Sequence, residues 1–178
     1  MKTLIKNKNT ISNKDNLIIL VNKNTNLSSF DLNQNEKKYI KDQQKNNQEI
    51  IVLNHYLRKI IIVNPKNINS KNLFVENIRG LGNKTYSELK EINNVSIQNL
   101  ERDKIDSSAF VEGLSLSHYQ FNNHKSKAKK NKDLTINIIN NKNNFFLMVI
   151  LAQVVTKSPL KTLKAPPLLG CAYLSSWS

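Results

Sequence analysis

The sequence has one cysteine, few arginines and no long apolar run, and each shortage narrows what the protein can be. Cys171 alone cannot form an internal disulfide, so a reducing compartment is expected. Residues 1–20 contain no uninterrupted apolar stretch of the length that a secretory signal needs. The apolar stretch at residues 145–155 is shorter than the roughly 20 residues that span a bilayer. We therefore expect a cytoplasmic protein with no membrane span.

The positive charge has two interpretations, because nearly all of it comes from lysine. The formal net charge is +14, and only three of the 27 basic residues are arginines. A strongly basic chain favours a nucleic acid or an anionic membrane as partner. Nucleic-acid surfaces, however, favour arginine, whose planar group binds phosphate and guanine through paired hydrogen bonds. The 29 asparagines indicate a general bias toward the residues of AT-rich codons, and we favour this compositional interpretation.

The common catalytic and metal-binding motifs are missing. His55, His118 and His124 show no ligand spacing, and we expect them to be surface or hydrogen-bonded residues. The segment 80–85 does not match the G-x-x-x-x-G-K-[ST] phosphate loop, which favours packing glycines or a helix break. Cys171 lies in a proline-containing segment with no basic partner arranged around it. We expect no catalytic residue and no metal site in this chain.

Apolar runs and periodicities predict strands that alternate with helices. Short apolar or β-branched runs predict strands at residues 16–21, 50–53, 57–63, 95–97 and 134–139, the second and third forming a hairpin. Longer segments predict helices at residues 33–47, 70–91 and 106–121. Tyr39 and Ile40 are the strong apolar anchors of the first helix. Strands interleaved with helices indicate an α/β fold with a mixed sheet covered by helices.

The most informative stretch is residues 106–130. Asp106 or Ser107 can cap the helix that begins there. Residues at i, i+4, i+7 and i+11 define its inner face: Phe110, Leu114, Ser117 and Phe121. Gly113 interrupts the helix, where glycine costs about 1 kcal/mol relative to alanine. We therefore expect close packing against another element at that position.

This stretch resembles the end of the N-terminal domain of the leucyl (cytosol) aminopeptidase family. In that family an A-x-x-E-G-x-x-L-x-x-Y-x-F/Y helix leads into a K-S-K turn. The matching residues are Ala109, Glu112, Gly113, Leu116, Tyr119, Phe121, Lys125, Ser126 and Lys127. The segment 77–82 is similar to the family's L/I-R-x-x-G helix, and residues 30–63 to its polar helix and strand pair. The resemblance implies a macro-domain-like α/β module.

The same resemblance has consequences for activity. Intact members of the family are metal-dependent peptidases that remove N-terminal residues from peptides and assemble as hexamers, with this domain at the periphery. Their two divalent ions, zinc or manganese, lie in a C-terminal domain that carries a Lys followed by an Asp and an N-T-D-A-E-G-R run. Neither motif occurs here, and a two-metal centre needs such bridging carboxylates. The resemblance therefore implies a chain without a cofactor of its own and inactive alone.

The composition changes abruptly near residue 144. All asparagines lie at or before Asn144, and residues 145–178 contain no Asn, Asp or Glu. We divide the chain into an aminopeptidase-like α/β domain at 1–144 and an irregular or helical apolar tail at 145–178. The family's interdomain helix would begin in this tail, but its expected continuation is absent. A frameshift or premature stop before the catalytic domain is our preferred explanation, and a genuine lineage-specific tail is the alternative.

A lysine cluster follows the aminopeptidase-like helix. It comprises Lys125, Lys127, Lys129, Lys130 and Lys132. Such a cluster can contact phosphate backbones without sequence specificity, and some family members bind DNA. The simpler interpretation is a solvated loop. Two other classes of function stay open, a small basic nucleic-acid-binding module and association of the basic, apolar tail with a membrane surface.

Overall fold

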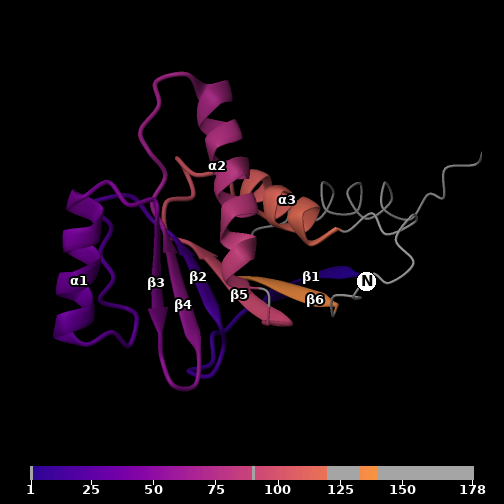
Figure 1. The fold of residues 1–178 in the computed structure, drawn as a ribbon, viewed down its shortest axis with the longest axis horizontal. Coiled ribbons are helices and arrows are strands. Elements are labelled where there is room, and N and C mark those ends of the chain that lie inside the picture. Colours follow the sequence, from indigo (N-terminus) through magenta and orange to yellow (C-terminus); the bar gives the residue numbers. More distant parts are fainter. Residues whose placement is uncertain (1, 90, 120–132, 140–178) are drawn as a thin grey trace, which may run out of the picture.

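One six-stranded sheet with helices on both faces makes up the part of the chain that the structure describes (Figure 1). The computed structural model describes residues 2–89, 91–119 and 133–139. The strands are β1 (Thr3–Lys8), β2 (Leu17–Leu20), β3 (Ile50–Asn54), β4 (Lys59–Val63), β5 (Asn94–Asn99) and β6 (Leu134–Ile139). The helices are α1 (Gln34–Lys45), α2 (Lys71–Tyr86) and α3 (Ser107–His118), with a 3-10 turn η1 (Ser87–Leu89) after α2. The expected mixed sheet flanked by helices is confirmed.

The sheet is parallel except at one edge. Its strand order is β1-β6-β5-β2-β4-β3, and only β3 runs antiparallel to its neighbour. β2 lies near the middle, where every residue of Leu17–Leu20 is at most 1% exposed. A strand covered on both faces needs an unbroken apolar run, which is the pattern of LIIL.

The predicted hairpin forms, with one strand shorter than expected. β3 and β4 pair in register, with Ile51 opposite Ile62. The backbone N–H of His55 donates to the carbonyl of Arg58 at 2.9 Å, which closes the turn. Leu57, expected within the second strand, therefore lies in the turn and is 68% exposed. The hydrogen bond that closes the turn thus places the start of β4 at Lys59, although Leu57 is apolar.

Alternate residues of the central strands face two separate core layers. Ile18 and Leu20 of β2 pack in the layer that includes Phe110 of α3. Leu17 and Ile19 pack in the opposite layer, with Ile40 of α1. Successive side chains of a strand point to opposite faces, so one short run serves both layers. Figure 1 shows α1 on its own beside β3, whereas α2 and α3 lie together.

Helix α1 forms for local reasons and is held by one large apolar residue. Asn33 caps it in a capping box, accepting a hydrogen bond from the backbone N–H of Glu36 and donating its own backbone N–H to the Glu36 carboxylate. Ile40 is buried, but Tyr39, also expected as an anchor, is 46% exposed. Adjacent helical residues point in different directions, so both cannot face the sheet.

Helices α2 and α3 approach each other through glycines. A Cβ atom on Gly113 would lie 2.0 Å from the Arg79 carbonyl oxygen, and one on Gly82 would lie 2.2 Å from the Phe110 carbonyl oxygen. The close packing expected at Gly113 is therefore confirmed, and Gly82 is its counterpart. Gly80 has nothing within 4 Å of its Cβ position, and α2 runs on without a break. The helix-break alternative for this segment is wrong.

Strand β1 was not predicted, and two helix ends differ from expectation. β1 pairs with β6 in parallel, with Ile5 opposite Ile136. Its sequence TLIKNK is mostly polar, because an edge strand needs only one covered face. α2 ends at Tyr86 before the 3-10 turn instead of continuing to residue 91, and α3 ends at His118. Asp106 caps α3 by accepting the backbone N–H of Ser108 at 2.8 Å.

Candidate functional site

The histidines have structural roles where the structure describes them. His118 is buried, and its Nδ1 atom shares a hydrogen bond of 2.7 Å with the Thr3 hydroxyl. The His118 ring packs edge-on against Tyr86, with 5.7 Å between the ring centroids. His55 Nε2 lies 2.8 Å from Glu36 Oε1. His118 is therefore hydrogen-bonded, as expected, whereas His55 lies beside a carboxylate of α1. His124 lies outside the described residues.

The sequence-predicted lysine cluster cannot be placed. Lys125, Lys127, Lys129, Lys130 and Lys132 lie outside the described residues, as do Cys171 and the tail at 145–178. Within the described ranges, no group of three His, Cys, Asp or Glu side chains is arranged to hold a metal ion. The same part of the chain contains no helix with the length and apolarity needed to cross a membrane.

Two segments that resemble the family, 77–82 in α2 and 109–119 in and just after α3, contact each other. Arg79 of α2 donates two hydrogen bonds to Glu112 Oε2 of α3, at 3.0 Å from Nε and 2.9 Å from Nη2. Arg79 also pairs with Glu76 on its own helix. The hydrogen bonds from Glu76 and Glu112 raise the pKa of Arg79 above its ordinary value, which holds the charge in place. Together with Gly113, this pair fixes the register of the two helices.

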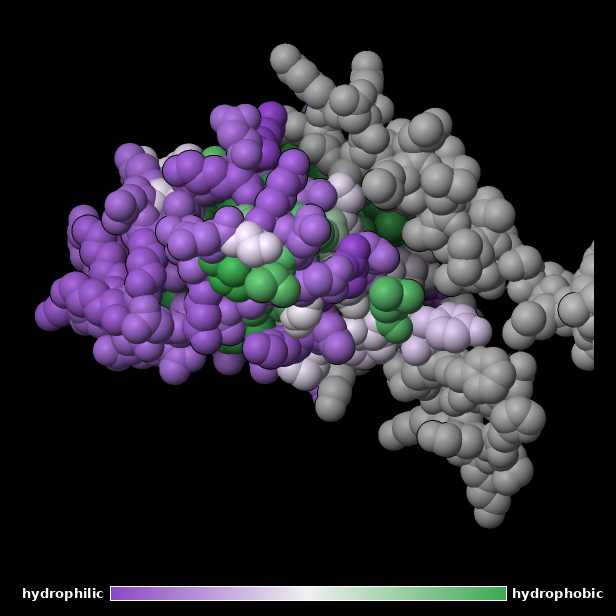
Figure 2. All heavy atoms as spheres, turned by 90° about the horizontal axis from the view of Figure 1, so that it is seen from above, coloured by the Kyte–Doolittle hydropathy of each residue, from purple (hydrophilic) through white to green (hydrophobic). Residues whose placement is uncertain are grey.

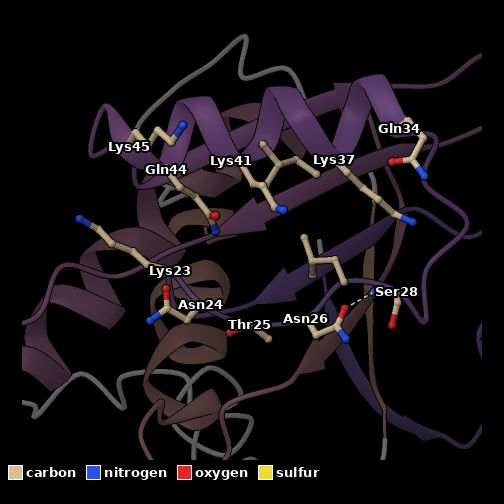
Figure 3. A pocket seen from close by; sticks show the side chains of 12 residues that line it. Lys23, Asn24, Thr25, Asn26, Ser28, Gln34, Lys37, Lys41, Gln44 and Lys45 are labelled. Atoms are coloured by element: carbon tan, nitrogen blue, oxygen red, sulfur yellow. Dashed lines mark hydrogen bonds between the residues drawn. The ribbon is translucent and has the colours of Figure 1, made fainter.

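A cavity lies on the other face of the sheet, between α1 and the segment that follows β2 (Figure 3). Its volume is about 730 Å³. Four lysines line it: Lys23, Lys37, Lys41 and Lys45. Neutral polar groups line the rest of its wall: Asn24, Thr25, Asn26, Ser28, Gln34 and Gln44. Leu27 and Ile40 supply the apolar part. No carboxylate belongs to this lining, so the cavity is cationic.

Hydrogen bonds hold the segment opposite α1 in shape. The Thr25 hydroxyl accepts the backbone N–H of Asn22 at 2.8 Å and donates to the Glu101 carboxylate at 2.7 Å. Asn26 Oδ1 accepts the backbone N–H of Ser28 at 2.9 Å. Thr25 thus connects the segment after β2 to the segment after β5. These hydrogen bonds hold the turn that forms one wall of the cavity. Seen from above, the described surface on the α1 side of the molecule is mainly hydrophilic (Figure 2).

The lysine row of α1 was missed, although its spacing was visible in the sequence. Lys37, Lys41 and Lys45 recur every four residues within the predicted helix 33–47, so they share one helix face. Their spacing alone predicts a solvated helix face. The cavity forms only because residues 23–28 lie opposite that face, and this depends on the tertiary fold.

Comparison with known proteins shows a shared fold. No protein-family model matches the sequence, and no curated protein matches it either. The structure is similar to that of a mutant of tomato leucine aminopeptidase, with a TM-score of 0.57 and 14% sequence identity. That similarity covers 87% of this chain and 36% of the tomato enzyme. Leucine aminopeptidase from Caenorhabditis elegans is matched at a TM-score of 0.40 and 16% identity, over 87% of this chain and 35% of that one. The chain thus spans about a third of the length of each enzyme.

Proposed function

We propose that this chain is a non-catalytic N-terminal domain of a leucyl aminopeptidase-like metallopeptidase. The observation that carries the proposal is the contact between α2 and α3. The segments 77–82 and 109–119, which resemble the family in sequence, are distant along the chain but pack together through Arg79, Glu112 and Gly113. The fold shared with tomato leucine aminopeptidase supports the same assignment.

The family-like residues have physical tasks at this contact. Gly113 permits an approach that any side chain would prevent, because its Cβ would collide with backbone and not with a movable side chain. Glu112 completes a charged hydrogen-bond pair with Arg79, the kind of contact that fixes geometry as well as adding energy. A chance resemblance would not be expected to coincide with residues that determine how two helices pack.

The proposal assigns peptide cleavage to a different part of the intact enzyme. Two-metal hydrolysis needs carboxylates that hold two ions about 3.5–4 Å apart. The described residues offer no group of ligands for even one ion. We accordingly propose that zinc or manganese belongs to a catalytic domain, which is the natural partner of this one. Assembly as a hexamer and a cytoplasmic location follow from the same family assignment.

The proposal is tested first at the gene. Genomic DNA immediately 3′ of this reading frame, read in all three frames, is expected to encode the N-T-D-A-E-G-R run and the preceding Lys and Asp. Finding them in another frame would also support an interrupted gene and a division of the chain at residue 144. Unrelated sequence in every frame would contradict the assignment to an aminopeptidase.

A second test measures activity of the full-length chain. Purified protein is incubated with a leucine anilide and added Zn²⁺ or Mn²⁺, with tomato leucine aminopeptidase as the active control. We expect no turnover above the buffer blank, because the family's catalytic lysine and metal-binding carboxylates are absent from this sequence. Turnover that co-purifies with the chain and is abolished by a chelator would show that the domain is catalytic.

A further inference from the structure

The cationic cavity runs along α1, beside the segment that follows β2. β2 continues through α1 to β3 on one side of the sheet, whereas β5 continues through α3 to β6 on the other side. β2 and β5 are neighbours and run parallel, so the connections leave their carboxyl ends in opposite directions. Such a switch point can open a crevice beyond the strand ends. The cavity borders this point only on the β2 side, because its lining comes from residues 23–28 and from α1. The Asn24–Ser28 wall of the cavity belongs to the segment that leaves β2 at this point.

Two of the four cavity lysines, Lys37 and Lys41, are available to a ligand, whereas Lys23 and Lys45 have polar neighbours. Lys23 Nζ donates to Asn47 Oδ1 at 2.7 Å, and Lys45 Nζ lies 3.5 Å from the exposed Asp42 carboxylate. Among the described residues, no carboxylate lies within 4.0 Å of the Lys37 or Lys41 ammonium groups. Side chains of the same charge repel each other when they lie four residues apart on a helix, because they are then neighbours on its surface. Lys37, Lys41 and Lys45 therefore form a row whose repulsion an anion would relieve.

The neutral groups complete an anion site. Figure 3 shows the side chains of Lys37, Lys41 and Gln44 pointing from α1 toward the Asn24–Ser28 segment. Gln44 is buried and lines the cavity near the C-terminal end of α1. Amide and hydroxyl groups such as those of Gln44 and Ser28 can donate hydrogen bonds to phosphate oxygens. The volume of about 730 Å³ falls within the range of small-molecule sites and exceeds what a single phosphate fills.

We propose that this cavity binds a small diphosphate-bearing anion. Lysine binds phosphate as a point charge, and a phosphate group carries more negative charge than a carboxylate, which suits a lining with four lysines and no acidic residue. More than one phosphate matches several lysines in one concavity. Leu27, which is partly exposed, leaves apolar wall for an organic group attached to the diphosphate. This site is separate from the α2–α3 contact and does not depend on the aminopeptidase assignment.

Isothermal titration of the full-length chain tests the proposal, with inorganic pyrophosphate as the probe at physiological salt. The double variant Lys37→Gln/Lys41→Gln is expected to weaken binding by at least about tenfold, since charged hydrogen bonds to the anion are lost. The matched control, Lys38→Gln/Lys71→Gln, removes the same charge from exposed positions outside the cavity lining. We expect the control to change affinity by less than about twofold, because exposed charges at a distance are screened. Circular dichroism verifies that both variants are folded.

Three outcomes would overturn the proposal. They are no binding of pyrophosphate at millimolar concentration, an equal loss in both variants, and tighter binding of a 20-base-pair DNA duplex through the same two lysines. The second would reduce the effect to overall charge, and the third would assign the lysines to nucleic acid. A nucleoside diphosphate is titrated in parallel with inorganic pyrophosphate. Tighter binding of the nucleotide would assign the apolar wall at Leu27 to its organic part, whereas equal binding would identify the diphosphate alone as the ligand.

Discussion

The α2–α3 face of the sheet is closed by contact between backbones, whereas the α1 face encloses a cavity lined by lysines. On the first face, Gly82 and Gly113 each lie against backbone atoms of the opposite helix, and Phe110 is fully buried in the same core layer. On the second face, a single helix anchored by Ile40 lies across from a polar turn. Both faces derive from the same strands, so the difference comes from the covering elements.

We infer from this contrast that the α2–α3 face serves mainly the stability of the fold, whereas the α1 face carries the proposed anion site. At the α2–α3 crossing, Gly82 and Gly113 let the backbones of the two helices come into direct contact. The α1 face retains a row of like charges, which costs about 0.2–0.5 kcal/mol for each i,i+4 pair. Local choices that reduce stability are expected at functional sites. The predictions below test this division, from the largest expected effect to the smallest.

Replacing a buried core side chain with alanine should lower the free energy of unfolding more on the α2–α3 face than on the α1 face. We expect Phe110→Ala to lower the free energy of unfolding by about 3–5 kcal/mol, because a large buried ring leaves a cavity that backbone contacts keep open. Ile40→Ala should cost about 2 kcal/mol, near the lower end for such changes, because a single helix beside a cavity can relax. Chemical denaturation measures both values. A larger cost for Ile40→Ala would contradict the division.

The glycines provide the sharpest comparison within one helix pair. Gly113→Ala should destabilise the protein by about 1–3 kcal/mol, because its Cβ meets the Arg79 carbonyl oxygen at 2.0 Å and a backbone must shift. Gly80→Ala is the matched control. Its Cβ position is open, so alanine should stabilise the protein by about 0.5–1 kcal/mol through helix propensity. Thermal melts of the two variants should move in opposite directions; shifts of the same sign would show that the contact between the helices is loose.

The sequence predicted those features that depend on local pattern. Unbroken apolar runs identified β2 and β4, and the capping residue Asp106 marked the start of α3. The position of Gly113 within an otherwise helical segment indicated close packing before its partner was known. β1 could not be recognised from the sequence, because its few apolar residues form no strand pattern of their own and the strand depends on pairing with β6.

The candidate site could be predicted only in part. The four-residue spacing of Lys37, Lys41 and Lys45 gave one wall of the cavity. The opposite wall, residues 23–28, is positioned by the connection from β2 and by the hydrogen bond from Thr25 to Glu101. Thr25 and Glu101 are 76 positions apart in the sequence. No local pattern encodes such a contact. For the same reason, the sequence could not show that Gly82 packs tightly while Gly80 does not.

Acid should affect the connection between β1 and β2. Burial raises the pKa of Asp15, but hydrogen bonds from Lys8 and the Ser12 backbone, with the charges of Lys8 and Arg58, more than offset it and leave this pKa below 3.8. The folded state thus holds the charged form more strongly, so the stabilisation is present above the unfolded pKa and disappears as pH falls through the folded value. Asp15→Asn should lower stability at neutral pH and flatten its decline below about pH 4. If the stability of Asp15→Asn falls below pH 4 as steeply as that of the original protein, the Lys8–Asp15 ion pair contributes nothing to the free energy of unfolding.

The smallest effect should be a gain in stability on the α1 face. Lys41 lies four residues from both Lys37 and Lys45, so Lys41→Gln removes two like-charge pairs and should stabilise the free protein by about 0.4–1 kcal/mol. Lys38→Gln is the control on the same helix, because Lys38 lies four residues before Asp42 and its loss should be neutral or slightly destabilising. Thermal melts at low salt measure both changes.

Adding pyrophosphate should reverse the order of the two melting temperatures. A ligand that binds only the folded state raises the melting temperature, and Lys41→Gln would lose that increase. If Lys41→Gln destabilises the free protein, the lysine row is part of the packing and the proposed division between the two faces fails.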